Sequence, residues 1–260
     1  MNGESFIVTR EDDLRSWLTK NRSPVDREID GLDVGWGGVQ RWATARMPQP
    51  GDDLHLDFAC GVGTFLAQLG WRFPGARLVG LNIDFAGPHK PIRALLARAK
   101  VRASLVESDA RKMPFEDRVF NSVSCFLGLQ DIDIGFGDQG IRLALSEAVR
   151  VLRMGGALTL LDEWPLARFD RLVEGLPVRI VARAEHSPGV RWSRKVAERA
   201  IQVYADGWVD QRRTSDPRAR AQLRAETLAR LRADMNRQLE TYGFYAPFGP
   251  VRMVVAIRTA

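Results

Sequence analysis

The sequence predicts an α/β fold built on an open, doubly wound and mostly parallel sheet. From residue 54 to residue 162, short apolar runs alternate with helical patterns, the order that right-handed strand–helix–strand crossovers require. Runs such as "RLVGLNI" and "LTLLD" are almost continuously apolar, as expected of strands covered by helices on both faces. The length of 260 residues suits one such sheet with an added element.

The elements of this sheet follow one another at regular spacing. Strands are predicted at residues 54–58, 77–82, 104–107, 119–125 and 157–162. Helices are predicted at residues 63–72, 88–100 and 139–153. Two later runs, "GFYAP" and "VRMVVAIRT", predict a terminal antiparallel hairpin around Gly249 and Pro250. The hairpin would bring the sheet to seven strands.

The segment between the fifth strand and the predicted hairpin has helical rather than strand periodicity. One apolar stripe comprises Val196, Ala200, Ile201, Tyr204 and Trp208, and a second comprises Leu228, Leu231, Met235 and Leu239. Both stripes are typical of core packing, so we expect a helical cap here. The cap is also dense in arginine, with Asp and Glu interspersed, which favours solvated helix faces over a basic binding surface.

The composition indicates a globular protein without a membrane span. Hydrophobic residues make up 45% and charged residues 27%, and no apolar run is long enough to cross a bilayer. The start, "MNGESFIVTREDD", lacks the pattern of a signal peptide. Cys60 and Cys125 form no disulfide framework, so we expect a cytoplasmic protein. The histidines are dispersed, and no metal site is predicted.

Short polar and glycine-rich sequence segments, here called marks, follow the predicted strands. They lie at the edge where open α/β sheets bind ligands. "DFACGVGTF" follows the first strand, and its glycines allow the backbone to approach a ligand at a helix N-terminus. Asn82 ends the second strand about twenty residues later, where a hydrogen-bonding side chain can hold a ribose. Further marks follow in "ESDARKMPFED", "CFLGLQDID" and "LLDEW". Their order predicts a nucleotide-like ligand more specifically than any one mark.

Taken together, the marks resemble the class I S-adenosylmethionine-dependent methyltransferases, in the ubiquinone/menaquinone-type branch. "LDFACGVGTF" matches the acidic residue and glycine turn of that family, and "LVGLNID" echoes its "VxGxD" pattern. "SDARKMPFEDRVFNSV" follows "GDAxxLPFxDxxFDxV", and "EAVRVLRMGG" follows "ExxRVLxPGG". The resemblance covers residues 52–164. It implies a Rossmann-like seven-stranded sheet that binds S-adenosyl-L-methionine and releases S-adenosyl-L-homocysteine.

The resemblance also implies roles for individual residues. Asp57 would face the methionine amino group, Asn82 would take the place of the ribose-binding acid, and Asp109 would accept from the adenine amino group. The full set of implied cofactor contacts is Asp57, Ala59, Cys60, Gly61, Gly63, Asn82, Ile83, Asp109, Ala110, Phe126 and Leu127. Trp36 and Trp164 are expected to line the acceptor pocket, and Asp131 and His186 are candidate catalytic residues. Asp117 and Arg150 are expected to be structural.

Four parts of the chain follow from the same resemblance. Residues 1–50 would form helices that cover the cofactor site, and residues 51–164 would form the cofactor-binding core. Residues 165–241 would form the helical cap that selects the acceptor, together with the last core helix. Residues 242–260 would form the terminal hairpin.

Two departures from the family pattern bear on the cofactor site. Ala59 stands where the first glycine is usual, which is acceptable if its φ is negative. Asn82 replaces a carboxylate, although an amide still offers one acceptor and two donors. His55 alternates along the first strand and is expected to be a core residue with its hydrogen bonds satisfied.

The predicted reaction is direct methyl transfer to a small-molecule acceptor, by a monomer or homodimer without a membrane partner. The net charge of +6 and the arginine-dense cap leave an RNA methyltransferase as an alternative. Ala59 and Asn82 leave a non-catalytic cofactor-binding protein as another. A nicotinamide oxidoreductase is disfavoured, because "GVGTFL" lacks the third glycine of that fingerprint.

Overall fold

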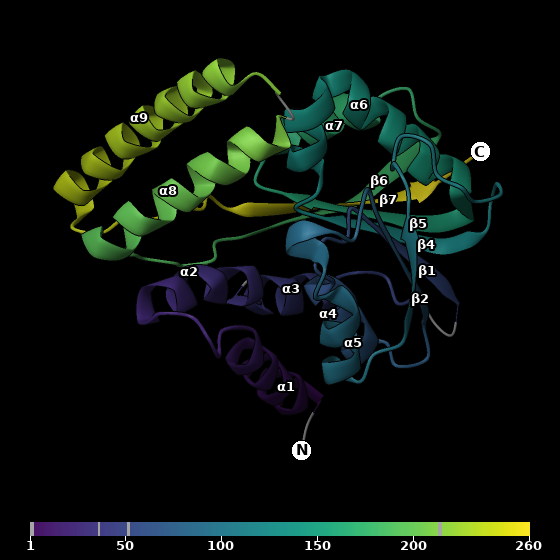
Figure 1. Cartoon of the computed structure of the whole chain (residues 1–260). Helices are drawn as coiled ribbons and strands as arrows, with labels where there is room; N and C mark the ends of the chain where they lie inside the picture. The colour runs from purple at the N-terminus through teal and green to yellow at the C-terminus, as the bar shows by residue number, and fades with distance from the viewer. Residues whose placement is uncertain (1–2, 36, 51–52, 213–214) are drawn as a thin grey trace. The chain divides into compact units, whose positions relative to one another are not determined.

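A computed structural model describes residues 3–35, 37–50, 53–212 and 215–260 of the protein. The chain forms two compact units (Figure 1). The sheet unit comprises Met1–Leu14, Gly37–His186 and Pro250–Ala260, and the helical unit comprises Arg15–Trp36 and Ser187–Gly249. The first helix, α1 (Gly3–Leu18), continues from one unit into the other.

The sheet unit contains a seven-stranded sheet in the order β3-β2-β1-β4-β5-β7-β6. Its strands are β1 (Leu54–Phe58), β2 (Arg77–Asn82), β3 (Ala103–Glu107), β4 (Phe120–Phe126), β5 (Leu152–Asp162), β6 (Val178–His186) and β7 (Val251–Arg258). The first five strands are parallel, and β7 pairs antiparallel with both β5 and β6. The predicted fold class is therefore confirmed. The chain order reverses between β1 and β4, where ligands bind in sheets of this kind.

The partner of the last strand differs from the prediction. Instead of pairing with "GFYAP", β7 pairs with β6, which lies inside the stretch predicted to be a helical cap. Tyr245 of "GFYAP" forms only an isolated bridge with Trp192, within the helical unit. The β6 sequence, "VRIVARAEH", was missed because its outward positions carry charged side chains, as an edge strand allows. The expected hairpin of residues 242–260 is thus wrong, and residues 165–241 include a core strand.

Helices cover both faces of the sheet (Figure 1). α3 (Gly37–Thr44), α4 (Thr64–Arg72) and α5 (Ile92–Ala99) lie on one face, with the short 3-10 turn η1 (Gly87–His89) before α5. α6 (Leu129–Val151) and α7 (Leu166–Val173) cover the opposite face. Because helices cover both faces, β1 and β4 are largely buried even at their polar residues.

α6 begins ten residues earlier than the predicted helix at 139–153 and is interrupted at Gly137, where φ is 65°. The first half of this helix was not predicted from the sequence, because it contains two glycines, Gly135 and Gly137, which are unfavourable inside helices. As a consequence, Asp131 lies in the first helical turn rather than in a loop.

The helical unit contains α2 (Pro24–Gly35), α8 (Arg194–Gln211) and α9 (Pro217–Tyr242). Its core contains the second predicted apolar stripe and the first one except Trp208, packed around Trp192 and Tyr245. α9 begins at Asp216, whose carboxylate accepts from the Arg218 N–H, and ends at Gly243 in the left-handed conformation. None of the helices in the described ranges is long and apolar enough to cross a bilayer.

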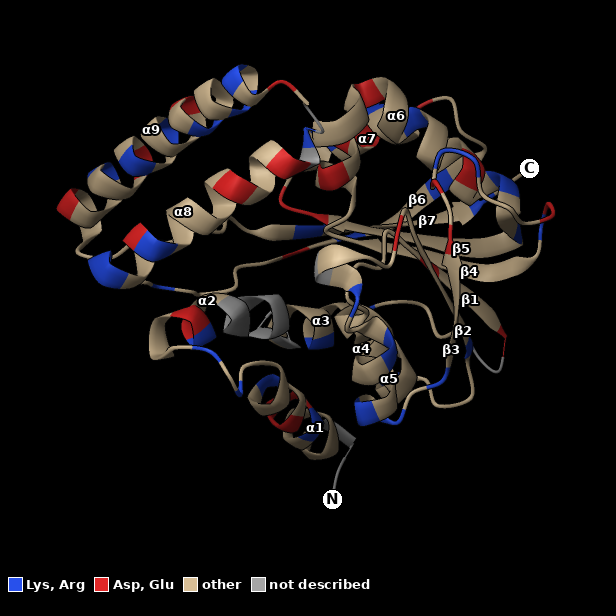
Figure 2. Ribbon diagram, in the orientation of Figure 1, with Lys and Arg blue, Asp and Glu red and all other residues tan. Residues whose placement is uncertain are grey.

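The arginines of the helical unit are interspersed with acidic residues (Figure 2). Arg220 pairs with Asp210 at 2.6 Å, Arg224 pairs with Asp206, and Arg199 pairs with Asp26 at 3.0 Å. These pairs are largely exposed and contribute little stability each, but they neutralise the charge locally. These ion pairs agree with the prediction that the arginine-rich segments form solvated helix faces.

Candidate functional site

The turn after β1 adopts left-handed backbone conformations at three positions. Ala59 and Gly61 both have φ of 53°, and Gly63 has φ of 84°. A Cβ on Gly61 would meet no atom within 4 Å, so this part of the turn borders open space, whereas a Cβ on Gly63 would lie 2.8 Å from Ile92 Cγ1. Gly61 thus permits a ligand to approach, and Gly63 permits α4 to begin close to α5. The condition under which alanine is easily accepted here, a negative φ, is therefore not met.

The methyl group of Ala59 is accommodated by a glycine on the neighbouring strand connection. A Cβ built on Gly128 would lie 2.5 Å from Ala59 Cβ and 3.0 Å from Cys125 Sγ. Gly128 follows Leu127, which is itself left-handed with φ of 55°. The turns after β1 and β4 are therefore both strained, a feature that clusters at ligand sites.

Asp57 occupies the carboxyl end of β1 as a fully buried carboxyl group. Its Oδ1 accepts a hydrogen bond from the Ser124 hydroxyl at 2.7 Å, and its Oδ2 has no hydrogen-bond partner among the residues that the structure describes. Burial raises the pKa of Asp57 to about 7, and the hydrogen bond from Ser124 opposes this rise. A buried oxygen without a partner is costly, so its retention indicates a place for a donor from a ligand.

Asn82, at the end of β2, ties that strand to the glycine turn. Its Oδ1 accepts from the Gly61 N–H at 3.2 Å, and its Nδ2 donates to the Asp84 carbonyl at 2.7 Å. A carboxylate could not make the second of these bonds, which gives a physical reason for the amide. Ile83 beside it is 36% exposed. The contact of Asn82 with a ribose stays a prediction, and the observed contacts show a structural role.

Asp109 follows β3 and is engaged by a nearby arginine. Both of its oxygens accept from the Arg111 guanidinium, at distances between 2.6 and 3.0 Å, and Oδ1 also accepts from the Arg111 N–H. The Arg111 guanidinium lies 3.5 Å from the centre of the Phe136 ring. Ala110 beside it is buried. An adenine amino group would therefore share Asp109 with Arg111, and the adenine role stays a prediction.

The ends of β4 and β5 carry an aromatic stack and two carboxyl groups. Phe126 stacks on Phe65 of α4, with ring centroids 4.7 Å apart, and the Leu127 N–H donates to the Leu161 carbonyl. Asp162 Oδ2 accepts from the Gln130 N–H, and burial raises its pKa to about 7. Burial also raises the pKa of Glu163 to about 7, and its Oε1 has no hydrogen-bond partner.

The remaining predicted residues lie in separate surroundings. His186 ends β6 and stacks on Trp42 at 5.2 Å, and burial lowers its pKa. Asp131 is exposed in the first turn of α6. Trp164 is covered by the Arg168 guanidinium at 3.7 Å and packs against the main core. Trp36 lies outside the described residues. Nothing in these contacts joins Asp131 to His186.

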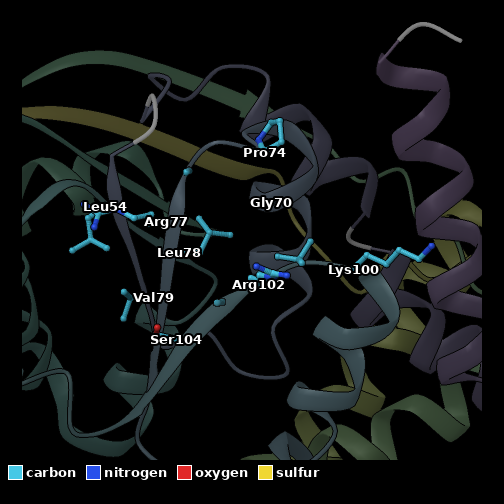
Figure 3. A pocket seen from close by; sticks show the side chains of 12 residues that line it. Leu54, Gly70, Pro74, Arg77, Leu78, Val79, Lys100, Arg102 and Ser104 are labelled. Carbon is cyan, nitrogen blue, oxygen red and sulfur yellow. The ribbon is translucent and has the colours of Figure 1, made fainter.

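A hollow of about 690 Å³ opens at the other end of the strands (Figure 3). Leu54 and Arg77, the first residues of β1 and β2, line it together with Ser104 of β3 and Arg102, which precedes β3. None of the predicted site residues is among its lining residues. It is therefore distinct from the ligand edge at the carboxyl ends.

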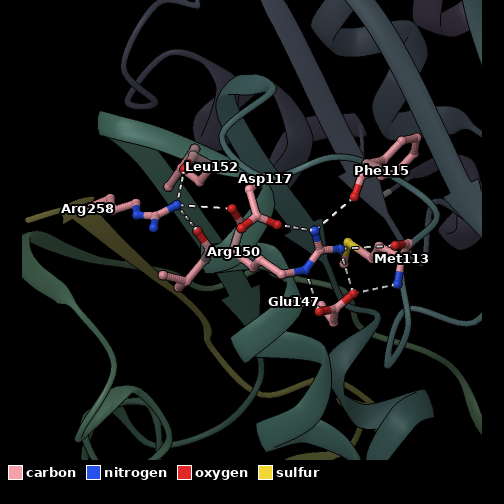
Figure 4. Close-up of polar contacts among 8 residues, drawn as sticks. Met113, Phe115, Asp117, Glu147, Arg150, Leu152 and Arg258 are labelled. Carbon is pink, nitrogen blue, oxygen red and sulfur yellow. Dashed lines mark hydrogen bonds and ion pairs between the residues drawn. The ribbon is translucent and has the colours of Figure 1, made fainter. Parts of the chain in front are cut away.

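The loop that carries Asp109 is held by Arg150 of α6 (Figure 4). The Arg150 guanidinium donates to the carbonyls of Met113 and Phe115 and to the carboxylates of Asp117 and Glu147, all between 2.7 and 3.0 Å. These contacts agree with the structural role expected for Asp117 and Arg150. They also join two sequence motifs that are more than thirty residues apart.

Comparison with known proteins identifies the sheet. Residues 56–156 match the family described as "Methyltransferase domain". This match agrees with the resemblance to class I S-adenosylmethionine-dependent methyltransferases. This methyltransferase domain begins in β1 and ends in β5, and it includes the predicted cofactor residues from Asp57 to Leu127. Trp36, Trp164 and His186 lie outside it.

Two curated relatives have the name demethylmenaquinone methyltransferase. The protein from Roseiflexus castenholzii is 34% identical over 149 residues, which cover 55% of this chain and 57% of the relative. The protein from Thermus thermophilus is 37% identical over 133 residues, which cover 51% and 56%. The chain thus spans little more than half the length of these relatives. A solved structure from Bacillus halodurans shares the fold, with a TM-score of 0.59, 16% identity, and coverage of 86% of this chain and 100% of that one.

Sequence reasoning found the methyltransferase domain but missed the residues that support its buried acid. Ser124 and Ser122 have no motif of their own, yet the two-residue alternation of β4 places both on the face shared with Asp57. Glu163 stood out in the sequence only as part of the "LLDEW" run at the end of the fifth strand. Its burial and missing partner distinguish it from exposed Asp131.

Proposed function

We propose that the protein binds S-adenosyl-L-methionine at the carboxyl edge of its sheet and transfers the methyl group to a small-molecule acceptor. The observation that carries this proposal is Asp57 Oδ2, a buried oxygen without a hydrogen-bond partner among the described residues, on the strand that leads into the glycine turn. An ammonium group fits such an oxygen, because it supplies three donors and the opposite charge. The residues present therefore fit the cofactor that the domain family uses.

The bound cofactor supplies a methyl group already activated on a sulfonium, so the chain has to bind, align and exclude water. Asp57 would hold the amino group, and the glycine turn would let the methionine part approach the backbone. Phe126 and Leu127, at the end of β4, would pack near the sulfonium. These roles are the ones that the family resemblance implies. The positions of Asp57, Phe126 and Leu127 at the ends of β1 and β4 agree with them.

The proton released by an acceptor needs a group that can take it. Glu163 Oε1 is buried and without a partner, and the raised pKa of Glu163, about 7, lies near neutral pH. Asp131 and His186 remain the predicted catalytic residues, and both are more accessible than Glu163. The names of the relatives make a quinol the first acceptor to test, with methylation at a ring carbon.

An RNA acceptor is the weaker proposal for this chain. The arginines of α8 and α9 are interspersed with acidic side chains that pair with several of them, which reduces the attraction for a phosphate backbone. A non-catalytic role has little support from Ala59 and Asn82, because Gly128 accommodates the first and the Gly61 N–H bonds the second.

The experiment combines binding with turnover. We expect S-adenosyl-L-homocysteine at 100 times its dissociation constant to stabilise the protein by about 2.7 kcal/mol, which a thermal melt detects. Labelled methyl transfer is then measured with a demethylated quinol and with bulk RNA, each at low and high salt. Absence of stabilisation at millimolar ligand would contradict the proposal, and labelling of RNA alone would replace the small-molecule acceptor with RNA.

A further inference from the structure

Four buried side chains form a continuous hydrogen-bonded chain across β1 and β4. Ser122 Oγ lies 2.7 Å from His55 Nδ1, His55 Nε2 lies 2.9 Å from Ser124 Oγ, and Ser124 Oγ lies 2.7 Å from Asp57 Oδ1. Each of the four residues is at most 5% exposed. We name this set the Asp57 relay.

The strand register explains why these side chains meet. His55 pairs with Ser122 and Asp57 pairs with Ser124 in the parallel ladder between β1 and β4. Because side chains alternate along a strand, all four lie on the same face of the sheet. The imidazole has two nitrogen atoms at opposite sides of its ring, so it bridges the two serines of the neighbouring strand.

With Asp57 ionised, the donors and acceptors of the relay have only one consistent arrangement. A carboxylate only accepts, so the Ser124 hydroxyl must donate to Asp57, and its oxygen then accepts from His55 Nε2–H. Burial lowers the pKa of His55 to about 3, so the ring is neutral and its Nδ1 accepts from the Ser122 hydroxyl. Every hydrogen bond thus points toward Asp57.

The relay supplies a hydrogen-bond donor to one carboxyl oxygen of Asp57 and none to the other. Oδ1 accepts from Ser124, while Oδ2 is buried without a partner. We propose that Ser124 and His55 are positioning residues that hold the Asp57 carboxylate with Oδ2 available to the amino group of the cofactor. This proposal rests on the proposed function and adds how the chain maintains the charge of its buried acid.

The surroundings of Asp57 show why such support is needed. Burial raises the pKa values of the Cys60 and Cys125 thiols, and the nearby Asp57 charge raises them further, so both thiols remain neutral. Burial raises the pKa of Asp57 to about 7, and the Ser124 hydrogen bond acts in the opposite direction. A donor from the relay and an ammonium from the ligand would together favour the ionised form.

The first test needs no ligand. The pKa of Asp57 is measured from carboxyl carbon chemical shifts in the wild type, Ser124→Ala and Ser124→Thr. We expect Ser124→Ala to raise it, because the donor to the carboxylate is lost, and Ser124→Thr to restore it with its hydroxyl. Thr159→Val is the matched control, because Thr159 is buried on β5 at the position paired with Ser124. An unchanged pKa in Ser124→Ala would overturn the relay.

The second test measures ligand binding by calorimetry between pH 6 and pH 9. We expect Ser124→Ala to weaken S-adenosyl-L-homocysteine binding about tenfold at pH 7, with its affinity profile displaced to higher pH. His55→Gln, which keeps a donor and an acceptor, should have a smaller effect. Methylthioadenosine lacks the amino acid part, so its affinity should be equal in wild type and Ser124→Ala. The ligand's own titration is common to all variants.

The outcomes separate the relay from the proposed function. A loss of affinity that is the same at every pH, and the same for methylthioadenosine, would show a general structural effect and overturn the positioning role. Wild-type protein that binds no S-adenosyl-L-homocysteine would instead overturn the proposed function and this use of the relay, while the carboxyl shifts would still report the hydrogen bond from Ser124.

Discussion

Arg150 and Asp57 are both charged groups of the sheet unit, but their hydrogen bonds are completed in different ways. The five N–H groups of the Arg150 guanidinium each find an acceptor on the protein. Asp57 is more deeply buried, yet one of its two oxygens finds no partner. A charge that the protein satisfies completely holds structure together, whereas a buried oxygen left without a donor is retained for what binds there.

The two regions also differ in the direction in which their carboxyl groups titrate. The hydrogen bond from Arg150 lowers the pKa of Glu147, so that carboxyl group favours its charged form in the folded protein. Burial raises the pKa of Asp57, so its charged form is disfavoured until a cation arrives. The comparison therefore predicts opposite consequences for mutation in the two regions.

The largest expected effect is the loss of stability in Arg150→Ala. The change leaves the carbonyls of Met113 and Phe115 without their Arg150 donor and leaves the Glu147 carboxylate with only the Met113 N–H among its described donors, which should cost about 3 kcal/mol of unfolding free energy. Arg150→Lys keeps the charge but lacks the planar guanidinium with its five donors, so it should retain only part of the unfolding free energy that Arg150→Ala loses. Urea denaturation measures both. Arg153→Ala is the control, because Arg153 donates only to the Arg118 carbonyl at 3.3 Å.

Asp57→Asn should have the opposite pattern. It should weaken binding of the cofactor and leave the unfolding free energy nearly unchanged. The loss of the charged acceptor should weaken S-adenosyl-L-homocysteine binding about 100-fold, or about 2.7 kcal/mol. Urea denaturation should show at most a small change, because the amide keeps an acceptor for Ser124. If calorimetry found equal affinities in Asp57→Asn and wild type, the assignment of Asp57 to the ligand would be wrong.

The sequence predicted the parallel half of the sheet nearly residue by residue. β1 and β2 have the predicted bounds, and the largely apolar run of β2 is typical of a buried parallel strand. β6 was missed because an edge strand carries charged residues and its partner, β7, is far away in sequence. Periodicity within a short window contains no information about such a pairing.

The site was predictable where a motif exists and was not where side chains meet across strands. The glycine turn, Asp57 and Asn82 were recognised from their spacing. The left-handed φ of Ala59 was not, because it depends on Gly128, which lies beyond the next strand of the sheet. The relay from Ser122 to Asp57 likewise requires the register of β1 against β4, which a single sequence does not reveal.

A pH titration of stability should distinguish the two kinds of carboxyl group. Asp57, Asp162 and Glu163 have folded pKa values raised to about 7, so between about pH 4 and pH 7 the folded state binds more protons than the unfolded state. Stability should therefore fall as pH rises through this window, with a limiting slope of about 1.4 kcal/mol per pH unit for each carboxyl group. His55, with a folded pKa of about 3, acts in the opposite direction below pH 6.5.

Urea denaturation at pH 5 and pH 8 measures that dependence. The wild type should be more stable at pH 5, and Asp57→Asn should reduce the difference because one of the three carboxyl groups is gone. Glu147 has a lowered pKa, so its stabilising contribution is present above its unfolded pKa and is lost as pH falls further. Equal stabilities at pH 5 and pH 8 would show that the three carboxyl groups are not held as the structure indicates.

The smallest expected effect concerns the backbone strain beside Asp57. Ala59 has φ of 53°, a conformation in which glycine is favoured, so Ala59→Gly should raise the unfolding free energy by about 1 kcal/mol. Gly128→Ala should lower it, because the new methyl would lie 2.5 Å from Ala59 Cβ. In the double variant the two changes should compensate in part, since removing the Ala59 methyl gives room for the new one. Additive effects in this double-mutant cycle, measured by urea denaturation, would show that the turns after β1 and β4 are not coupled.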